Sequence, residues 1–173
     1  LDVAKPHCFL GATGVIGEPL PDPNYVGSII PDLSVRLAEP DWQACAKAFM
    51  TTDTYPKGAA LSASIGDDTV NFAGIAKGSG MIAPNMATML AYVFTDLGVA
   101  PDVLDAALRT ACSTSFNAIT VDSDTSTSDS LMVFATGKSD VAPIASEMDP
   151  RYPDLVAALT QICLDLALQV VKD

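Results

Sequence analysis

The sequence predicts a layered α+β sandwich, and three observations support this. An alternating apolar run at 59–65 and a second run at 70–76 are separated by a short turn, which predicts a β-hairpin. Two later segments, opened by Pro101 and Pro153, carry apolar residues at three- and four-residue spacing and predict helices. Hairpins and helices therefore mix without strict βα alternation, which favours a layered sandwich.

The N-terminal part is expected to contain loops and one helix. The segment Phe9–Gly17 is apolar and has three glycines spaced three residues apart, and the proline-rich Glu18–Pro31 predicts a loop. Residues 39–41, Glu-Pro-Asp, then open a helix that is expected to end near Met50. Its apolar residues recur at helical spacing: Trp42, Cys45, Ala46 and Phe49.

The rest of the chain is expected to supply the sheet and two more helices. A polar connection at 51–57 leads into the hairpin, whose turn is Gly66-Asp67-Asp68. The run Met89–Phe94 is apolar on both faces, which is typical of a central strand. Short strands are predicted at Ile119–Val121 and Leu131–Phe134. The last helix has an apolar stripe made of Leu155, Val156, Leu159, Ile162, Cys163, Leu166 and Val170.

Composition and charge exclude several classes of function. The chain has 173 residues, 49% of them hydrophobic, which is enough for the core of one domain. Nine Lys and Arg against 21 Asp and Glu give a net charge of −12, so neither nucleic acids nor membrane surfaces are expected as partners. His7 is the single histidine, which removes zinc sites built on histidine pairs, and no metal is expected.

The cysteines and the hydropathy pattern predict a cytoplasmic location. The four cysteines have no CxxC spacing and are expected to be buried free thiols. No uninterrupted apolar run approaches the roughly 18 residues of a membrane-spanning helix, and the first residues do not resemble a signal peptide. The sequence has no initiator Met and stops directly after an apolar-periodic segment, so a piece of a longer protein is expected.

Three ligand-binding motifs fit poorly. Gly137-Lys138-Ser139 is similar to the end of a phosphate-binding loop, but Met132 stands where the first glycine is needed. The run 122–133 begins like a calcium loop but lacks its glycine and its closing glutamate. The pattern Gly78-x-Gly80-x-x-Ala83 fits a relaxed dinucleotide fingerprint, yet a proline and a strand follow, so a structural turn is expected.

The pair Ala87-Thr88 suggests a chemistry that needs no histidine. It lies between a Gly/Pro loop and the predicted central strand. If this peptide bond broke, Thr88 would gain an α-amine with a pKa of about 7.7–8.0, which can act as general base for the threonine's own hydroxyl. On spacing alone this signal is weak, because Ala-Thr pairs are common and a buried threonine is usually just packed.

A longer block around this pair carries a specific resemblance. Residues 74–90 read GIAKGSGMIAPNMATML, which is similar to the self-cleavage signature of the bifunctional ornithine acetyltransferase/N-acetylglutamate synthase (glutamate N-acetyltransferase) family. Three further blocks match this family in order: ATGVIGE at 12–18, MTTDT at 50–54 and SFNAITVD at 115–122. The matching blocks span nearly the whole chain.

The resemblance implies a self-processing acyltransferase of arginine biosynthesis. The precursor would cut itself between Ala87 and Thr88, with residues 1–87 ending the alpha subunit and 88–173 beginning the beta subunit. Thr88 would then take an acetyl group from N-acetylornithine and pass it to glutamate, with no cofactor; many members also accept acetyl-CoA. The implied assembly is a heterotetramer of two alpha and two beta subunits.

The resemblance also assigns four further residues and a fold. Thr13 and Gly14 match the oxyanion-hole pair, and Thr51 and Lys77 match positions that hold substrate. The Lys77 ammonium suits a carboxylate that acetylornithine and acetylglutamate share. The alternatives are a hydroxyl at a helix end and a solvated loop lysine. The implied fold is an α/β sandwich of the N-terminal-nucleophile type, with two sheets between helical layers, and the family continues past this chain with a substrate-holding glutamate.

Two other functions remain open. A self-processing aminopeptidase of similar fold would also use an N-terminal nucleophile, and it would hydrolyse amino-acid amides without acetyl transfer to glutamate. A non-catalytic metabolite-binding homologue would use the Gly78 loop to hold its ligand. Tight nucleotide binding by an uncleaved chain would indicate this second alternative.

Overall fold

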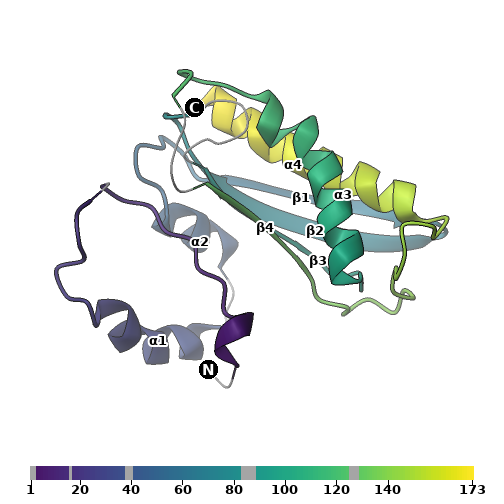
Figure 1. Ribbon diagram of the computed structural model, residues 1–173, viewed down its shortest axis with the longest axis horizontal. Helices are drawn as coiled ribbons and strands as arrows, with labels where there is room; N and C mark the ends of the chain where they lie inside the picture. The colour runs from purple at the N-terminus through teal and green to yellow at the C-terminus, as the bar shows by residue number, and fades with distance from the viewer. Residues whose placement is uncertain (1–2, 16, 38–40, 83–88, 125–128) are drawn as a thin grey trace.

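The fold is an α+β arrangement built on one mixed sheet of four strands, in the order β1-β2-β3-β4 (Figure 1). The computed structural model describes residues 3–15, 17–37, 41–82, 89–124 and 129–173. Its strands are β1 (Lys57–Ile65), β2 (Asp68–Lys77), β3 (Leu90–Thr95) and β4 (Ser130–Ala135). Its helices are α1 (Tyr25–Arg36), α2 (Trp42–Ala48), α3 (Pro101–Ser113) and α4 (Tyr152–Lys172), with short 3-10 turns η1 (Lys5–His7) and η2 (Phe116–Ala118). The α+β class expected from the sequence is confirmed.

The predicted hairpin is formed by β1 and β2 and is longer than the apolar pattern indicated. Ile65 pairs with Asp68 across a tight turn, in which Gly66 has a φ of +62°, a conformation that glycine adopts without strain. The Gly66 amide donates to Asp154 Oδ2 at 2.9 Å, which ties the turn to the start of α4. At the other end, β1 begins with Lys57 and β2 finishes with Lys77, so two lysines lie at one end of the hairpin.

The strand β3 is antiparallel to β2 and parallel to β4, and α3 with η2 forms the crossover between the two parallel strands. The strand predicted at Ile119–Val121 was wrong. The Thr120 hydroxyl and the Val121 amide instead donate to the Ile82 carbonyl, at 3.0 and 2.8 Å. A tertiary contact to one carbonyl therefore overrides the strand propensity of this short segment.

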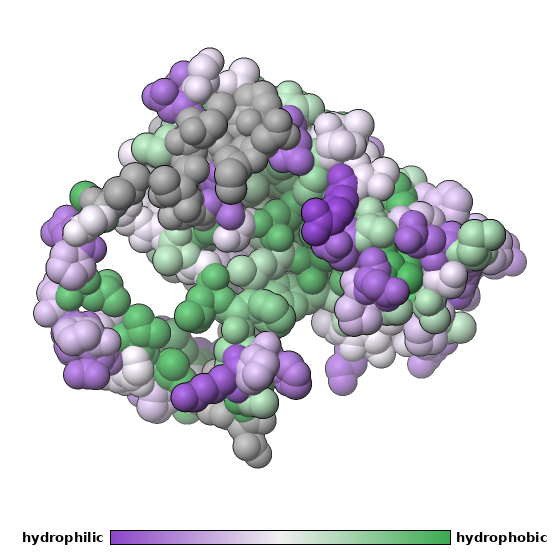
Figure 2. Space-filling view, in the orientation of Figure 1, coloured by the Kyte–Doolittle hydropathy of each residue, from purple (hydrophilic) through white to green (hydrophobic). Residues whose placement is uncertain are grey.

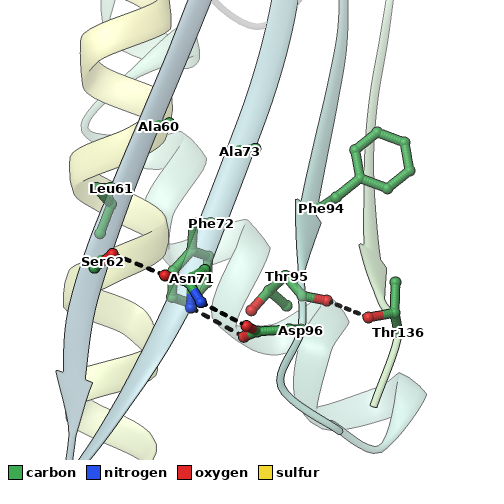
Figure 3. Close-up of a pocket in the computed structure, with 10 residues that line it drawn as sticks. All are labelled: Ala60, Leu61, Ser62, Asn71, Phe72, Ala73, Phe94, Thr95, Asp96 and Thr136. Carbon is green, nitrogen blue, oxygen red and sulfur yellow. Dashed lines mark hydrogen bonds between the residues drawn. The ribbon is translucent and has the colours of Figure 1, made fainter. Parts of the chain in front are cut away.

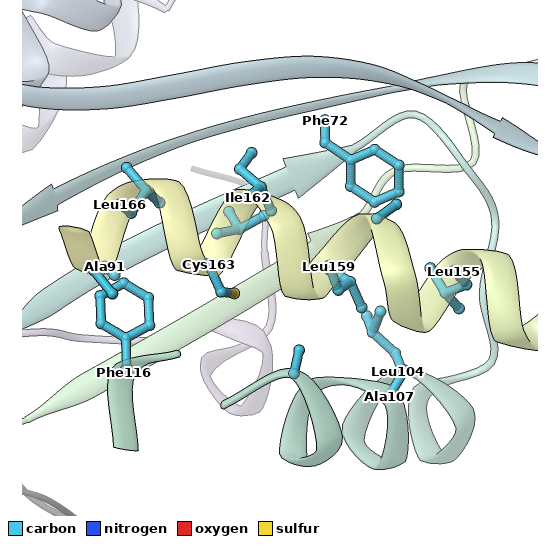
Figure 4. Close-up of a cluster of buried hydrophobic side chains, with 14 of the residues drawn as sticks. Phe72, Ala91, Leu104, Ala107, Phe116, Leu155, Leu159, Ile162, Cys163 and Leu166 are labelled. Carbon is cyan, nitrogen blue, oxygen red and sulfur yellow. The ribbon is translucent and has the colours of Figure 1, made fainter. Parts of the chain in front are cut away.

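The core lies between the sheet and a layer formed by α3 and α4, which run side by side over one face (Figure 1). Figure 4 shows the side chains of α4 pointing toward Phe72 and Ala91 of the sheet and toward Leu104 and Ala107 of α3. The apolar faces predicted for α3 and α4 are confirmed, whereas of the predicted apolar residues of α2 only Ala46 is buried. The buried residues of α4 are Leu155, Ala158, Leu159, Ile162, Cys163, Leu166, Ala167 and Val170.

Within the described residues, α4 is the one helix long and apolar enough to cross a membrane, judged by length and composition alone. Its apolar residues do not form one uninterrupted run, because Asp154 and Asp165 interrupt them. Its apolar stripe is buried against the sheet and α3. Core packing therefore accounts for the composition of this helix.

The N-terminal region contains a helix where a loop was predicted. The expectation of a loop throughout Glu18–Pro31 was wrong, because α1 occupies Tyr25–Arg36 with Pro31 inside it. Apolar residues recur at helical spacing along this segment, and the helix forms although an interior proline removes one hydrogen bond and clashes with the carbonyl four residues earlier. None of the residues of α1 is buried.

Aromatic side chains connect the N-terminal region to the open face of the sheet, opposite α3 and α4. Asp41 caps α2 by accepting the Ala44 amide at 2.9 Å, as expected for a helix starting there. Three ring contacts then follow across the face: Trp42 with Phe94 at 5.4 Å between centroids, Phe94 with Phe134 at 5.0 Å, and Phe134 with Phe9 at 6.2 Å. Figure 2 shows hydrophobic residues on both sides of an open gap between the N-terminal segment and the sheet.

The cysteines of the N-terminal region are more exposed than those of the helices that cover the sheet. All four are free, as predicted; Cys163 is buried and Cys112 is half-buried. Cys8 and Cys45 are exposed, so the prediction of burial was wrong for these two. Both belong to the N-terminal region, where few side chains are covered.

Candidate substrate site at the end of the hairpin

Two of the predicted site residues meet at the end of the β1–β2 hairpin. Lys77 ends β2, and its Nζ donates to Thr51 Oγ1 at 3.0 Å. The Lys77 side chain belongs to the interior, since the residue is 1% exposed, so it is not a solvated loop lysine. Thr51 is exposed, and its hydroxyl contacts the ammonium instead of capping a helix. The structure therefore pairs a buried cation with an accessible hydroxyl.

The two sequence blocks that carry these residues contact each other through residues 51–53 and 77–79. Asp53 Oδ1 accepts the Gly78 amide at 2.6 Å, and its other oxygen accepts the Thr51 amide at 3.2 Å. The hydroxyls of Thr52 and Ser79 are 2.8 Å apart. The loop before β1 is thus joined to the segment after β2 by contacts from three of its consecutive residues.

A buried ion-pair network lies behind this contact. Lys57 Nζ is 2.6 Å from Asp53 Oδ1 and 2.5 Å from Asp173 Oδ2, and all three side chains are shielded from solvent. The Thr54 amide and hydroxyl both donate to Asp173. The end of α4 is further held by the Tyr55 hydroxyl, which donates to the Gln169 carbonyl at 2.5 Å. Buried charges are costly unless paired, so the network fixes the loop, β1 and α4 together.

The surroundings of the site lower the pKa of both Asp53 and Lys77. This favours the charged form of Asp53 and disfavours the charged form of Lys77. Burial opposes ionisation of Asp53, but hydrogen bonds from the Gly78 amide, Lys57 and the Thr51 amide outweigh it and hold the pKa below its usual value. Burial lowers the pKa of Lys77, and the negative charges of Asp53 and Asp129 offset part of this effect. An additional carboxylate next to Lys77 would therefore stabilise its ammonium form.

The proposed oxyanion pair Thr13 and Gly14 lies on the N-terminal segment and is exposed. This segment crosses the open face of the sheet at Gly11, where a Cβ atom would overlap the Tyr92 hydroxyl, so a larger residue there would displace the Tyr92 side chain. The same Cβ position is 3.6 Å from the side chain of Leu90, the first residue of β3. The segment thus passes the start of β3, while the structure does not bring Thr13 or Gly14 into contact with Thr51 and Lys77.

Ala87 and Thr88, the predicted cleavage pair, lie outside the described residues. The chain on both sides is anchored by carboxylates. Asp122 accepts the amides of Met81 and Ile82 at 2.5 and 2.9 Å, and Asp129 accepts the Met89 amide at 2.8 Å. Asp122, which began the poor calcium motif, therefore serves as a backbone acceptor here. In the described part of the chain, no three His, Cys, Asp or Glu side chains come together as a metal site would require.

A separate cavity of about 490 Å³ lies on the open face of the sheet and includes none of the predicted site residues (Figure 3). Its polar groups bond to one another: Ser62 donates to Asn71 Oδ1 at 2.8 Å, and the Asn71 side-chain amide donates to Asp96 at 2.8 Å. Ala60, Ala73 and Phe94 make the rest of the wall largely apolar. This cavity therefore resembles a packing surface more than a polar substrate site.

Sequence reasoning missed three residues of the site: Asp53, Lys57 and Asp173. Asp53 stood inside the matching MTTDT block and could have been selected as a carboxylate between two threonines. Lys57 and Asp173 are 116 residues apart, and no local pattern predicts that contact.

Comparisons with known proteins identify the family. The model of the ArgJ family matches residues 1–173. Three curated relatives carry the name arginine biosynthesis bifunctional protein ArgJ. The one from Gluconobacter oxydans is 49% identical over 100% of this chain and 41% of its own length, and that from Bartonella henselae is 48% identical over 100% and 42%. The Rhizobium meliloti relative is 51% identical over 98% and 42%. The chain thus spans about two fifths of these relatives, and it belongs to the ArgJ family, as the sequence resemblance predicted.

Proposed function

We propose that this chain is the part of a self-processing acetyltransferase of arginine biosynthesis that carries the nucleophile and one side of the substrate site. The observation that carries the proposal is the contact between Lys77 and Thr51, which are 26 residues apart and match the family's substrate-holding positions. The relatives are named as bifunctional proteins of arginine biosynthesis, which supports the same assignment.

The proposed reaction begins with hydrolysis of the peptide bond between Ala87 and Thr88, in which one water is consumed, Ala87 gains a carboxylate and Thr88 gains an α-amine. The Thr88 hydroxyl then attacks the acetyl carbonyl of N-acetylornithine; its proton passes to the α-amine and from there to the departing ornithine amine. The amine of glutamate next attacks the acetyl-threonine ester, and Thr88 recovers its proton. Acetyl-CoA would enter as an alternative acetyl donor at the first step, and no cofactor is needed.

The substrate carboxylate is proposed to bind at Lys77 and Thr51. Lys57 and two backbone amides engage Asp53, and burial lowers the pKa of Lys77. A carboxylate arriving at Lys77 would therefore add a stabilising negative charge to those of Asp53 and Asp129. The adjacent Thr51 hydroxyl would add a second hydrogen bond.

Thr13 and Gly14 are proposed to stabilise the oxyanion. The support is the path of their segment, which passes beside Leu90, two residues after Thr88. A pair of donors there would bind the tetrahedral intermediate, and the loss of one such donor typically raises the barrier by about 2.7–4 kcal/mol.

The remaining length of the relatives is proposed to complete the fold. Trp42 of α2 and Phe9 of the N-terminal segment contact aromatic rings on the open face of the sheet and remain exposed, and a second sheet would cover this surface to make the layered sandwich. We place this second sheet in the part of the relatives that the chain does not span. The two cleaved subunits would stay together as a heterotetramer of two alpha and two beta subunits in the cytoplasm, where the free cysteines would remain reduced.

The test is an intact-mass spectrum of the full-length enzyme under denaturing conditions, before and after incubation with N-acetylornithine. We expect a subunit that begins at Thr88 and that gains the mass of one acetyl group. Thr88→Ala should give an uncleaved, unacetylated chain, whereas Thr69→Ala, at an exposed position in β2, should behave as the wild type.

The alternatives have distinct outcomes. An unbroken wild-type chain would contradict the proposal, and tight nucleotide binding by that chain would support a binding module. Amide hydrolysis without acetyl transfer to glutamate would instead indicate an aminopeptidase.

A further inference from the structure

We propose that Asp53 is a positioning residue of the substrate site, which acts with Lys57 to hold Thr51 and Lys77 in the arrangement that receives a substrate carboxylate. This inference rests on the proposed function. It concerns a carboxylate that does not itself contact substrate in this scheme and that acts through its neighbours.

The geometry places Asp53 at the centre of the site. One of its oxygens accepts the Gly78 amide and the Lys57 ammonium, each at 2.6 Å, and the other accepts the Thr51 amide. Gly78 has a φ of +146°, a conformation that favours glycine and is compatible with its amide pointing at Asp53. Asp53 binds the backbone amides of Thr51 and Gly78. Thr51 supplies the hydroxyl that accepts from Lys77, and Gly78 directly follows Lys77 in the chain. Asp53 therefore fixes both sides of the Thr51–Lys77 pair.

The position of Lys57 explains why Asp53 forms its ion pair with Lys57 and acts on Lys77 in another way. Lys57 is fully buried and lies between Asp53 and Asp173, at 2.6 and 2.5 Å. The Asp53 oxygens are thus occupied by Lys57 and by backbone amides. Asp53 therefore acts on Lys77 through its charge and through its backbone contacts to Thr51 and Gly78.

The charged groups that face Lys77 act in opposite directions. Asp53, from the loop before β1, and Asp129, from the segment before β4, raise the pKa of Lys77, whereas Lys57 of β1 lowers it. Burial is the largest influence and also lowers it. Removal of the Asp53 charge should therefore make Lys77 lose its proton at lower pH, and removal of the Lys57 charge should make it lose its proton at higher pH.

The opposite effects of Asp53 and Lys57 on the pKa of Lys77 distinguish a positioning role from a purely structural one. Carboxylate binding requires a protonated Lys77, so the alkaline limb of kcat/KM for N-acetylornithine reports its titration. In the full-length enzyme, Asp53→Asn should raise KM by roughly tenfold or more, with a smaller change in kcat, because the charged hydrogen bonds that fix the site are lost. The same variant should shift the alkaline limb to lower pH, and Lys57→Met should shift it to higher pH.

The controls keep the inference falsifiable. Asp105→Asn removes a carboxylate from an exposed ion pair with Arg109 on α3 and should leave both KM and the limb unchanged. If Asp53→Asn does not fold, the Lys57 variants provide the test. Lys57→Met should move the alkaline limb of kcat/KM, and Lys57→Arg, which keeps the charge, should return it to the wild-type position. Unchanged limbs, or limbs that move in the same direction in the two charge-removing variants, would overturn the inference.

Failure of the inference and failure of the proposed function give different results. If Lys77→Met raises KM while Asp53→Asn does not, the substrate site stands and the role of Asp53 is wrong. If Lys77→Met leaves KM unchanged, or the wild type does not transfer acetyl groups, the proposed function itself is wrong.

Discussion

The packed part of the molecule, formed by the sheet with α3 and α4, and the N-terminal region with α1 use similar apolar side chains in opposite ways. Leu159 of α4 is 0% exposed, whereas Leu33 of α1 is 51% exposed and Phe9 66%. Helical periodicity is present in both α1 and α4. The difference teaches that periodicity predicts a helix, but a helix face is buried only where a second surface of the same chain meets it.

The same division separates the parts of the proposed site. Thr51 and Lys77 are held by the hairpin, by the Asp53 network and by the end of α4. Thr13 and Gly14 lie on the exposed N-terminal segment, which contacts the sheet near Gly11. The carboxylate side of the site is therefore built by the packed part, and the oxyanion side depends on a region whose apolar surface is still uncovered.

The largest expected contrast concerns core leucines. Leu159→Ala should lower the free energy of unfolding of the 173-residue chain by about 2–5 kcal/mol, because it leaves a cavity between α4 and the sheet. Leu33→Ala in exposed α1 should change it by less than about 0.5 kcal/mol. Urea denaturation followed by far-UV circular dichroism measures both, and equal losses would remove the distinction between the two regions.

Two glycines should respond to alanine with opposite signs. A Cβ on Gly74 of β2 would lie 3.1 Å from the Tyr92 carbonyl oxygen and 3.0 Å from Leu166 Cδ1, so Gly74→Ala should destabilise by about 1–3 kcal/mol. A Cβ on Gly27 of α1 would meet no atom within 4 Å, and alanine is the better helix former, so Gly27→Ala should stabilise by about 0.5–1 kcal/mol. Thermal unfolding midpoints that fall for Gly27→Ala, or that do not fall for Gly74→Ala, would count against the packing described here.

Acid should weaken the anchored end of the hairpin first. The pKa values of Asp53 and Asp173 lie below their usual values, despite burial, because Lys57 and backbone or hydroxyl donors stabilise the carboxylates. The stability they contribute is present above the unfolded value of about 3.9 and is lost as the pH falls through the lower folded values. Hydrogen exchange of the Thr51 and Gly78 amides between pH 5 and about 3, corrected for intrinsic rates, should show this loss, and α3 amides provide the comparison.

Thiol reactivity should show the smallest but simplest contrast. Burial raises the pKa of Cys163 to about 12 and that of Cys112 to about 11, so both should react slowly with a thiol reagent at pH 8. Cys8 and Cys45 are exposed and should react quickly. Mass-spectrometric counting of labelled thiols over time in the 173-residue chain checks this, and rapid labelling of Cys163 would contradict the packing of α4.

The sequence predicted the parts of the fold whose signals are local. The alternation around Gly66, the prolines that open α3 and α4, and the apolar stripe of α4 each match the structure. Two local signals misled: Pro31 suggested a loop where α1 forms, and the β-branched residues at 119–121 suggested a strand. The segment 119–121 is held by the distant Ile82 carbonyl, which its sequence window does not contain, whereas α1 follows the helical spacing of its own segment despite Pro31.

The candidate site was predictable to the extent that motifs carried it. The resemblance predicted Thr51 and Lys77 as site residues, and in the structure Lys77 Nζ lies 3.0 Å from Thr51 Oγ1. The network behind them was not predictable, because Lys57 and Asp173 meet only when α4 returns to the start of β1. Long-range ion pairs of this kind leave no periodic or spaced pattern in a single sequence.

The most direct test of the account compares N-acetylornithine with its carboxamide, which lacks the negative charge, in the wild-type full-length enzyme and in Lys77→Met. The account predicts that the wild type prefers the acid by roughly tenfold to a hundredfold in kcat/KM, the range expected for a hydrogen bond between charged groups. In Lys77→Met this preference should disappear, while Lys138→Met, at an exposed lysine, should retain it. A preference for the acid that survives in Lys77→Met would contradict the claim that Lys77 receives the substrate carboxylate.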